Sequence, residues 1–150
     1  MRTLRMRLGL LACACALALG SPLARSAGCT VSTSGLNFGN YDVFSPLNDD
    51  ITATVNVDCP SDTAYSIWLS SGSGTFSSRT LRNGSLLLGY NLYLDPTHLT
   101  IWGDGSAGTG TVSGTGTGSN IATTVYGRIP AGQNVSVGPY ADVVTITVNF

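Results

Sequence analysis

The four cysteines are the residues of this 150-residue chain whose type and spacing bear most directly on chemistry. Cys13 and Cys15 fall in an apolar N-terminal run, whereas Cys29 and Cys59 lie further along the chain. A catalytic thiol would need a neighbouring base and a metal site would need more ligands, and His98 is the only histidine. In an oxidising compartment Cys29 and Cys59 therefore favour a single intramolecular disulfide, which would stabilise the fold by about 3–4 kcal/mol through loop closure.

The other reactive side chains do not converge on a catalytic set. His98 follows a turn at Asp95-Pro-Thr and has no nearby cysteine or second histidine, which predicts a solvated loop histidine. The aspartates are scattered over turns and strand ends, without an Asp-x-Asp-x-Asp-Gly calcium loop. No Gly-x-Ser-x-Gly elbow is present. We therefore predict a protein that is not an enzyme and that uses no metal or other cofactor.

Apolar residues also occur in a connection between strands that begins at Pro96 and ends at Gly103. Leu99, Ile101 and Trp102 have two interpretations there. They either pack over one end of the fold, or they are exposed and adhere to apolar surfaces.

Residues 1–27 predict a secretory signal peptide. They contain arginines at the start, an apolar run from Leu8 to Leu19, and small residues up to Ala27. The apolar run is roughly a dozen residues, shorter than the ~20 that span a bilayer, so we predict no membrane insertion. Removal of the signal would leave one domain, residues 28–150, outside the cytoplasm with only Cys29 and Cys59.

The charge of that remaining part excludes one class of partner. The sequence has no Lys and no Glu, and beyond residue 27 three arginines face eight aspartates, a formal net charge of −5. This balance argues against nucleic acid or an anionic membrane as the main partner. The 19 glycines and the missing Lys and Glu also disfavour helices.

Apolar and polar residues alternate along most of the remaining chain, which predicts β-strands. Strands are predicted at 51–58, 65–70, 86–94, 121–129 and 141–150, with a weaker strand or pair between 29 and 43. The glycine- and threonine-rich tract 108–119 lacks Lys and leads into a strand, so it predicts a flexible hairpin connection rather than a phosphate-binding loop. About six strands and no helix predict an all-β, antiparallel, immunoglobulin-like β-sandwich.

The last predicted strand ends the chain at Phe150 and suggests an incomplete sandwich. It places Val144, Ile146, Val148 and Phe150 on one face, as candidates for the core or for a groove. A sandwich lacking its last strand would leave a sheet edge uncovered, which a secreted protein must protect. Either the sheets close without help, or another chain supplies the missing strand.

Six segments strengthen the second interpretation. They are LNFGNYD (36–42), VNVDC (55–59), LLGYNLYLD (87–95), WGDG (102–105), YGRIPAGQ (126–133) and GPYADVVTITV (138–148). In this order they resemble the spore coat protein U (SCPU) family, which includes the subunits of archaic, Csu-type chaperone–usher pili.

The resemblance implies a pilin fold that lacks its seventh strand. A periplasmic chaperone would lend that strand first, and the N-terminal segment of a neighbouring pilin subunit would replace it at an outer-membrane usher. The resemblance also implies the Cys29–Cys59 disulfide, secretion through the periplasm to the cell surface or pilus, and a part in cell adhesion and biofilm formation.

One difference from polymerising subunits carries a further expectation. Those subunits have a donor segment before their first cysteine, whereas almost nothing separates the predicted cleavage site from Cys29. This predicts a tip-like subunit that accepts a strand and donates none. The alternatives are an adhesin that binds through the loop 99–102, or a self-sufficient spore-coat-like domain.

Overall fold

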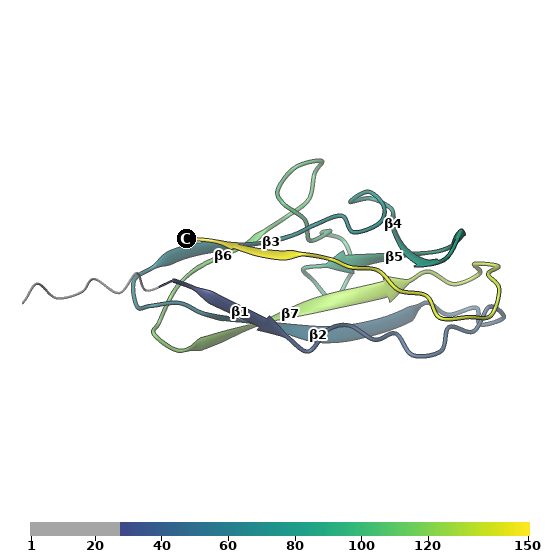
Figure 1. Ribbon diagram of the computed structural model, residues 1–150, viewed down its shortest axis with the longest axis horizontal. Helices are drawn as coiled ribbons and strands as arrows, with labels where there is room; N and C mark the ends of the chain where they lie inside the picture. Colours follow the sequence, from purple (N-terminus) through teal and green to yellow (C-terminus); the bar gives the residue numbers. More distant parts are fainter. Residues whose placement is uncertain (1–27) are drawn as a thin grey trace, which may run out of the picture.

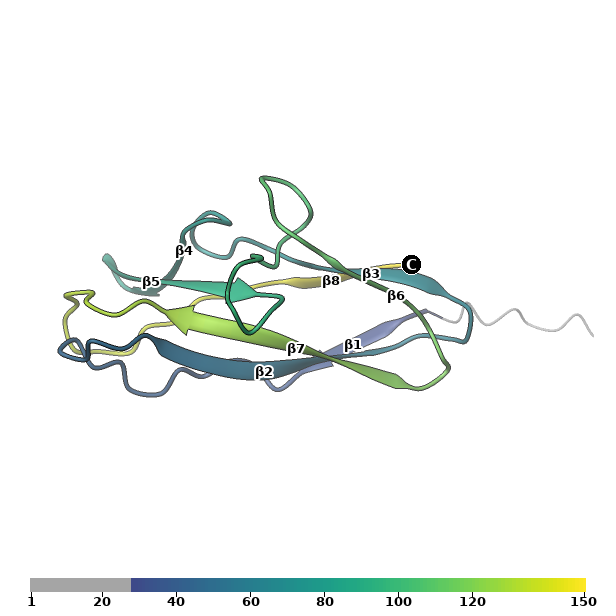
Figure 2. The same cartoon turned by 180° about the vertical axis from the view of Figure 1, so that it is seen from behind.

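The computed structural model describes residues 28–150, so the predicted signal peptide lies outside the described part. The described residues form an elongated sandwich of two antiparallel sheets (Figures 1 and 2). The strands are β1 (Thr30–Thr33), β2 (Asp49–Asp58), β3 (Ala64–Leu69), β4 (Arg79–Asn83), β5 (Leu86–Tyr93), β6 (Val112–Thr115), β7 (Asn120–Ile129) and β8 (Ile146–Asn149). The larger sheet has the order β1-β2-β7-β5-β4 and the smaller one β6-β3-β8. The all-β, immunoglobulin-like sandwich predicted from the sequence is thereby confirmed.

Residues 28–150 contain no helix that is long and apolar enough to cross a membrane.

The predicted alternation sets which residues face the space between the sheets. In β3, Tyr65, Ile67 and Leu69 are buried, whereas Trp68 points outward. The same period of two buries every second residue at the C-terminal ends of β2 and β7. The buried apolar side chains of the described part are Val55, Val57, Cys59, Tyr65, Ile67, Leu69, Leu88, Tyr90, Leu92, Trp102, Val125 and Ile129.

The structure corrects the sequence prediction in three segments. The sequence prediction omitted β4, a strand that contains two arginines. The tract 108–119 is not only a flexible connection, because β6 lies within it and pairs with β3. The predicted strand 141–150 is regular only over β8, because the chain before it passes from one sheet to the other.

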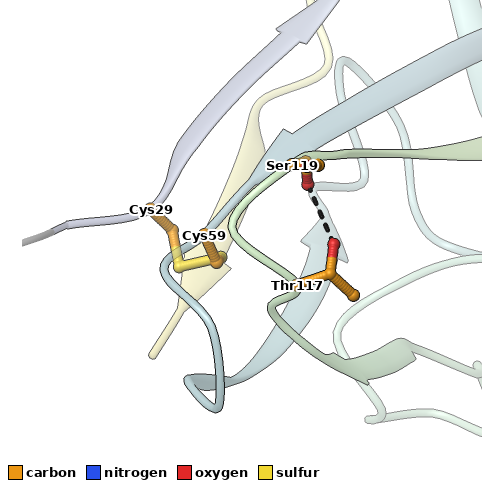
Figure 3. Close-up of a disulfide and its surroundings, with 4 residues drawn as sticks. All are labelled: Cys29, Cys59, Thr117 and Ser119. Carbon is orange, nitrogen blue, oxygen red and sulfur yellow. Dashed lines mark hydrogen bonds between the residues drawn. A yellow bond between two sulfur atoms is a disulfide. The ribbon is translucent and has the colours of Figure 1, made fainter.

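The disulfide joins the start of the described chain to the end of β2 (Figure 3). Cys29 and Cys59 are bonded, with their Cα atoms 4.3 Å apart. The loop between β6 and β7 packs beside the bond, where Gly118 donates its backbone N–H to the Cys59 carbonyl oxygen at 3.1 Å. A Cβ at Gly116 would clash with Cys59 and Pro60, so the glycine-rich tract permits this close approach. Figure 3 shows Thr117 and Ser119 on the same loop, joined by a 3.4 Å hydrogen bond.

Candidate functional site

A large apolar groove lies between the two sheets, with a volume of about 920 Å³. Its inner surface consists of core side chains of both sheets, among them Val55, Leu69 and Val125. Protein interiors are normally packed without voids larger than a few water molecules. A space of this size therefore marks a part of the sandwich that the described residues do not fill.

Two chain segments border the groove. On one side runs the irregular segment that follows β1, with Leu36, Phe38 and Tyr41 half-buried against the core. On the other side runs the segment that leads into β8, drawn in yellow along the length of the molecule in Figure 1. The sequence predicted a weaker strand or pair between 29 and 43, and β1 is the one regular strand that the structure has in this range.

Both sheets end in a free strand beside this groove. In the described part of the chain β1 pairs only with β2, and β8 pairs only with β3. The two edge strands approach each other at the disulfide end, where Gly28 lies next to the Phe150 ring. A free strand edge presents unpaired backbone N–H and C=O groups, which can pair with an added strand. The groove thus combines an apolar interior with hydrogen-bonding edges.

The four residues predicted on one face of the last segment have different places in the structure. Val144 and Ile146 line the groove, and Val148 is half-buried against the core. Phe150 is 66% exposed and lines no part of the groove, so its assignment to the groove or core was wrong. It follows the end of β8, and its ring lies next to Gly28 rather than against the core.

A polar cluster interrupts the apolar lining near the start of this segment. The Tyr90 hydroxyl donates to Asp142 Oδ2 at 2.7 Å, and Asp142 Oδ1 accepts from the backbone N–H groups of Ser73 (2.9 Å) and Val143 (2.8 Å). Burial alone would raise the pKa of Asp142, but these hydrogen bonds together lower it. Burial raises the pKa of Tyr90, so the phenol stays a donor. No sequence pattern indicated this cluster, since Ser73, Tyr90 and Asp142 are far apart along the chain.

The loop 99–102 is only partly the exposed finger that the sequence allowed. Trp102 is completely buried, and its Nε1 donates to the Ile67 carbonyl oxygen at 3.1 Å, so the exposed interpretation is wrong for this residue. Ile101 is half-buried, and Leu99 is 83% exposed. The loop is held by Asp95, whose pKa falls to about 2 because Thr97 and the following backbone N–H groups donate to it.

His98 is not the solvated loop histidine that the sequence predicted. Its side chain is 8% exposed and lies edge-on to Tyr93, with ring centroids 5.0 Å apart. Its Nε2 is 3.8 Å from Asp50 Oδ1, and Arg128 donates to both oxygens of Asp50 at 2.6 Å. The hydrogen bonds from Arg128 lower the pKa of Asp50.

Residues 28–150 contain no group of three or more His, Cys, Asp or Glu side chains placed to hold a metal ion.

Comparisons with known proteins agree with the resemblance of the sequence segments. The family model described as Spore Coat Protein U domain matches residues 16–147. Protein U of Myxococcus xanthus is 37% identical over 141 residues, covering 85% of this chain and 78% of that protein.

The fold is similar to a chain in the crystal structure of the CsuC–CsuE chaperone–tip adhesion subunit pre-assembly complex, from archaic chaperone–usher Csu pili of Acinetobacter baumannii. The TM-score is 0.62 at 19% sequence identity, and the match covers 83% of this chain. This chain spans 40% of the length of that one. At this identity the likeness establishes the fold alone.

Proposed function

The chain belongs to the Spore Coat Protein U domain family, and from this premise we propose that it is a structural subunit of a surface pilus or coat, completed by a strand from a partner chain. The observation that carries the proposal is the apolar groove of about 920 Å³ between two free sheet edges. We propose a secreted, non-catalytic protein that the cell exports through the periplasm.

A strand fits this groove better than a small apolar molecule does. A small ligand would fill the apolar volume but would leave the backbone groups of the flanking edges unpaired. An added strand pairs with those edges and places every second side chain in the groove. Val144 and Ile146 alternate along the border with the same period of two. The side chains of the added strand would therefore pack between those of this border segment.

The partners follow from this arrangement. An uncovered apolar groove is an aggregation hazard before assembly, so we propose that a periplasmic chaperone covers it first. A neighbouring subunit then replaces the chaperone at an outer-membrane usher. The chain of similar fold was solved in complex with a chaperone, which supports a chaperone as one partner.

Two finer expectations stay predictions. The tip position depends on residues before Cys29, which lie outside the described part of the chain. Adhesion through the loop 99–102 would depend on Leu99, since Trp102 is buried. One exposed leucine is ordinary on a protein surface, so the structure favours the groove over this loop as the functional site.

The experiment is expression in the periplasm with and without a chaperone of the archaic chaperone–usher class. Size-exclusion chromatography with light scattering then measures the mass of the soluble species. We expect a low yield of soluble chain by itself, with the rest aggregated or degraded, and a 1:1 complex when the chaperone is present. A chain that is soluble and monomeric by itself, and that does not bind the chaperone, would instead be a self-sufficient coat domain.

A further inference from the structure

The last segment of the chain changes sheets just before β8. Ala141 pairs with Arg82 of β4 in the larger sheet through two backbone hydrogen bonds of 2.8 and 3.0 Å. Four residues later, the Thr145 carbonyl oxygen accepts from the Ser70 N–H at 3.0 Å, beside β3 of the smaller sheet. The intervening residues therefore pass from the larger sheet to the smaller one along the border of the groove.

Asp142 lies at this crossover and ties it to two other segments. Its carboxylate accepts from the Tyr90 hydroxyl on β5 and from the Ser73 N–H in the loop before β4. A Cβ at Gly72 would clash with the same carboxylate, so the loop approaches as closely as a glycine allows. Gly72 also has a φ of +62°, which a glycine adopts without strain.

Val143 and Val144, which lie between Asp142 and Thr145, make fewer hydrogen bonds than either of those residues. Val143 is 82% exposed, and its backbone N–H donates to the Asp142 side chain rather than to a strand. Val144 lines the groove but belongs to no strand of the structure. The direction of this border segment consequently depends on the hydrogen bonds of Asp142 at its start and on the two hydrogen bonds between Ser70 and Thr145 at its end.

We propose that Asp142 is a positioning residue that holds the border segment 143–145 in the orientation that receives the partner's strand, an inference that rests on the proposed function. Asp142 is part of the groove lining, but its proposed role does not require contact with the incoming strand. It acts through Val143 and Val144, whose backbone and side chains border the groove. The effect of its removal should therefore appear in strand uptake by protein that remains folded.

The test compares three full-length, oxidised proteins: wild type, Asp142→Ala and Asp142→Asn. The probe is a fluorescein-labelled peptide of about 12 residues in which valine alternates with threonine and lysine, and its uptake is measured by fluorescence anisotropy. A peptide of the same composition without alternation is the control ligand. Asp104→Ala is the matched control protein, because within residues 28–150 the Asp104 side chain accepts hydrogen bonds only from Ser106 in its own exposed loop.

We expect Asp142→Ala to weaken peptide binding roughly tenfold, a loss that corresponds to one or two buried hydrogen bonds. Asp142→Asn should bind within about threefold of wild type, because its amide oxygen still accepts from Ser73 and Val143. Hydrogen exchange should be faster at the Ser73 and Val143 amides of Asp142→Ala, and unchanged in β2 and β7. Asp104→Ala should resemble wild type in both measurements.

Other outcomes would contradict the inference in distinguishable ways. Equal peptide affinity of wild type and Asp142→Ala, both measured where urea titration shows them folded, means that Asp142 contributes stability alone. Loss of affinity in Asp142→Asn as large as in Asp142→Ala would contradict positioning by hydrogen-bond acceptance. If wild type takes up neither peptide nor chaperone, the proposed function is wrong and the inference falls with it.

Discussion

The guanidinium of Arg79 donates a hydrogen bond of 2.8 Å to the carbonyl oxygen of Trp102 inside the core. Arg79 is fully buried at the start of β4, and Trp102 is fully buried after β5. The same guanidinium also donates to the Ser70 carbonyl oxygen and, at 2.7 Å, to Asn91 Oδ1. Burial lowers the pKa of Arg79. A buried cation thus joins β4, β5 and two loops, and no carboxylate is hydrogen-bonded to it.

Replacement of Arg79 should destabilise the fold strongly. Arg79→Met keeps most of the apolar volume but leaves the Ser70 and Trp102 carbonyl oxygens without this donor. Each buried acceptor that loses its partner costs about 1–3 kcal/mol, so we expect a loss of about 3 kcal/mol in the free energy of unfolding. Equilibrium urea unfolding, followed by tryptophan fluorescence, measures it.

The matched control for this prediction is Arg82→Met on the same strand. Arg82 is exposed, and its side chain donates only to Ser73 among the described residues. We expect a change below about 1 kcal/mol. An equal loss of unfolding free energy in Arg79→Met and Arg82→Met would mean that the buried hydrogen bonds of Arg79 stabilise the fold no more than the exposed one of Arg82.

The disulfide should stabilise the protein because it closes a loop and so restricts the unfolded chain. Cys29 and Cys59 are 30 positions apart, and a loop of this length predicts a loss of about 3–4 kcal/mol when both are changed to serine. Urea unfolding of this double variant, beside wild type with and without reductant, checks the value. Identical midpoints for oxidised and reduced wild type would show that the bond is dispensable.

Most of the fold was predictable because strand periodicity and burial coincide in it. In β3 the sequence alternates apolar and polar residues, and the structure buries Tyr65, Ile67 and Leu69 accordingly. β4 was not predictable by this rule, because its most buried residue is an arginine. Its burial depends on acceptors that residues 70, 91 and 102 supply, which a local pattern cannot reveal.

The groove was only partly predictable for a similar reason. Val144 and Ile146 follow the alternation, and both line the groove. The alternation could not reveal the change of sheet at Asp142, because a period of two is the same in either sheet. Trp102 was ambiguous because an apolar residue in a loop can point inward or outward, and its partners in the core, Ile67 and Arg79, are distant in sequence.

A charge in the groove should prevent strand uptake. Val144→Asp would place a carboxylate against the apolar lining, where burial of an unpaired charge is strongly unfavourable. We expect the yield of the 1:1 chaperone complex to fall at least about tenfold. Pull-down of the tagged chaperone from periplasmic extracts, with quantification of the bound chain, measures this yield.

Thr147→Asp is the matched control, since Thr147 lies on the exposed face of β8. The same charge in the same segment should leave the complex near its wild-type yield. A similar loss in both variants would point to general damage to the last strand rather than to occupancy of the groove.

The two apolar residues at the ends of the loop 99–102 should behave differently. Trp102→Ala removes a buried indole and should cost about 3–5 kcal/mol, whereas Leu99→Ser changes an exposed side chain and should stay within about 0.5 kcal/mol of wild type. Urea unfolding gives both values. Adhesion to polystyrene beads is then informative only for Leu99→Ser, and a large loss there would support the adhesin alternative.

Asp49 should make the opposite contribution to pH-dependent stability from Asp142. Burial, followed by the charge of Asp50, raises the pKa of Asp49, and its Oδ2 is buried without a hydrogen-bond partner among the described residues. A raised folded-state pKa means that the ionised form costs stability above that pKa, and that the cost disappears as the pH falls below the unfolded-state value. Asp49→Asn should therefore raise the urea midpoint at pH 7 and leave it unchanged near pH 3.

For Asp142 the folded-state pKa is lowered, so its contribution to stability is present above the unfolded-state pKa and is lost as the pH falls through the folded-state pKa. Asp142→Asn should accordingly lower the midpoint at pH 7 and have little effect at acid pH, and an effect of the same sign in both variants would contradict these opposite environments.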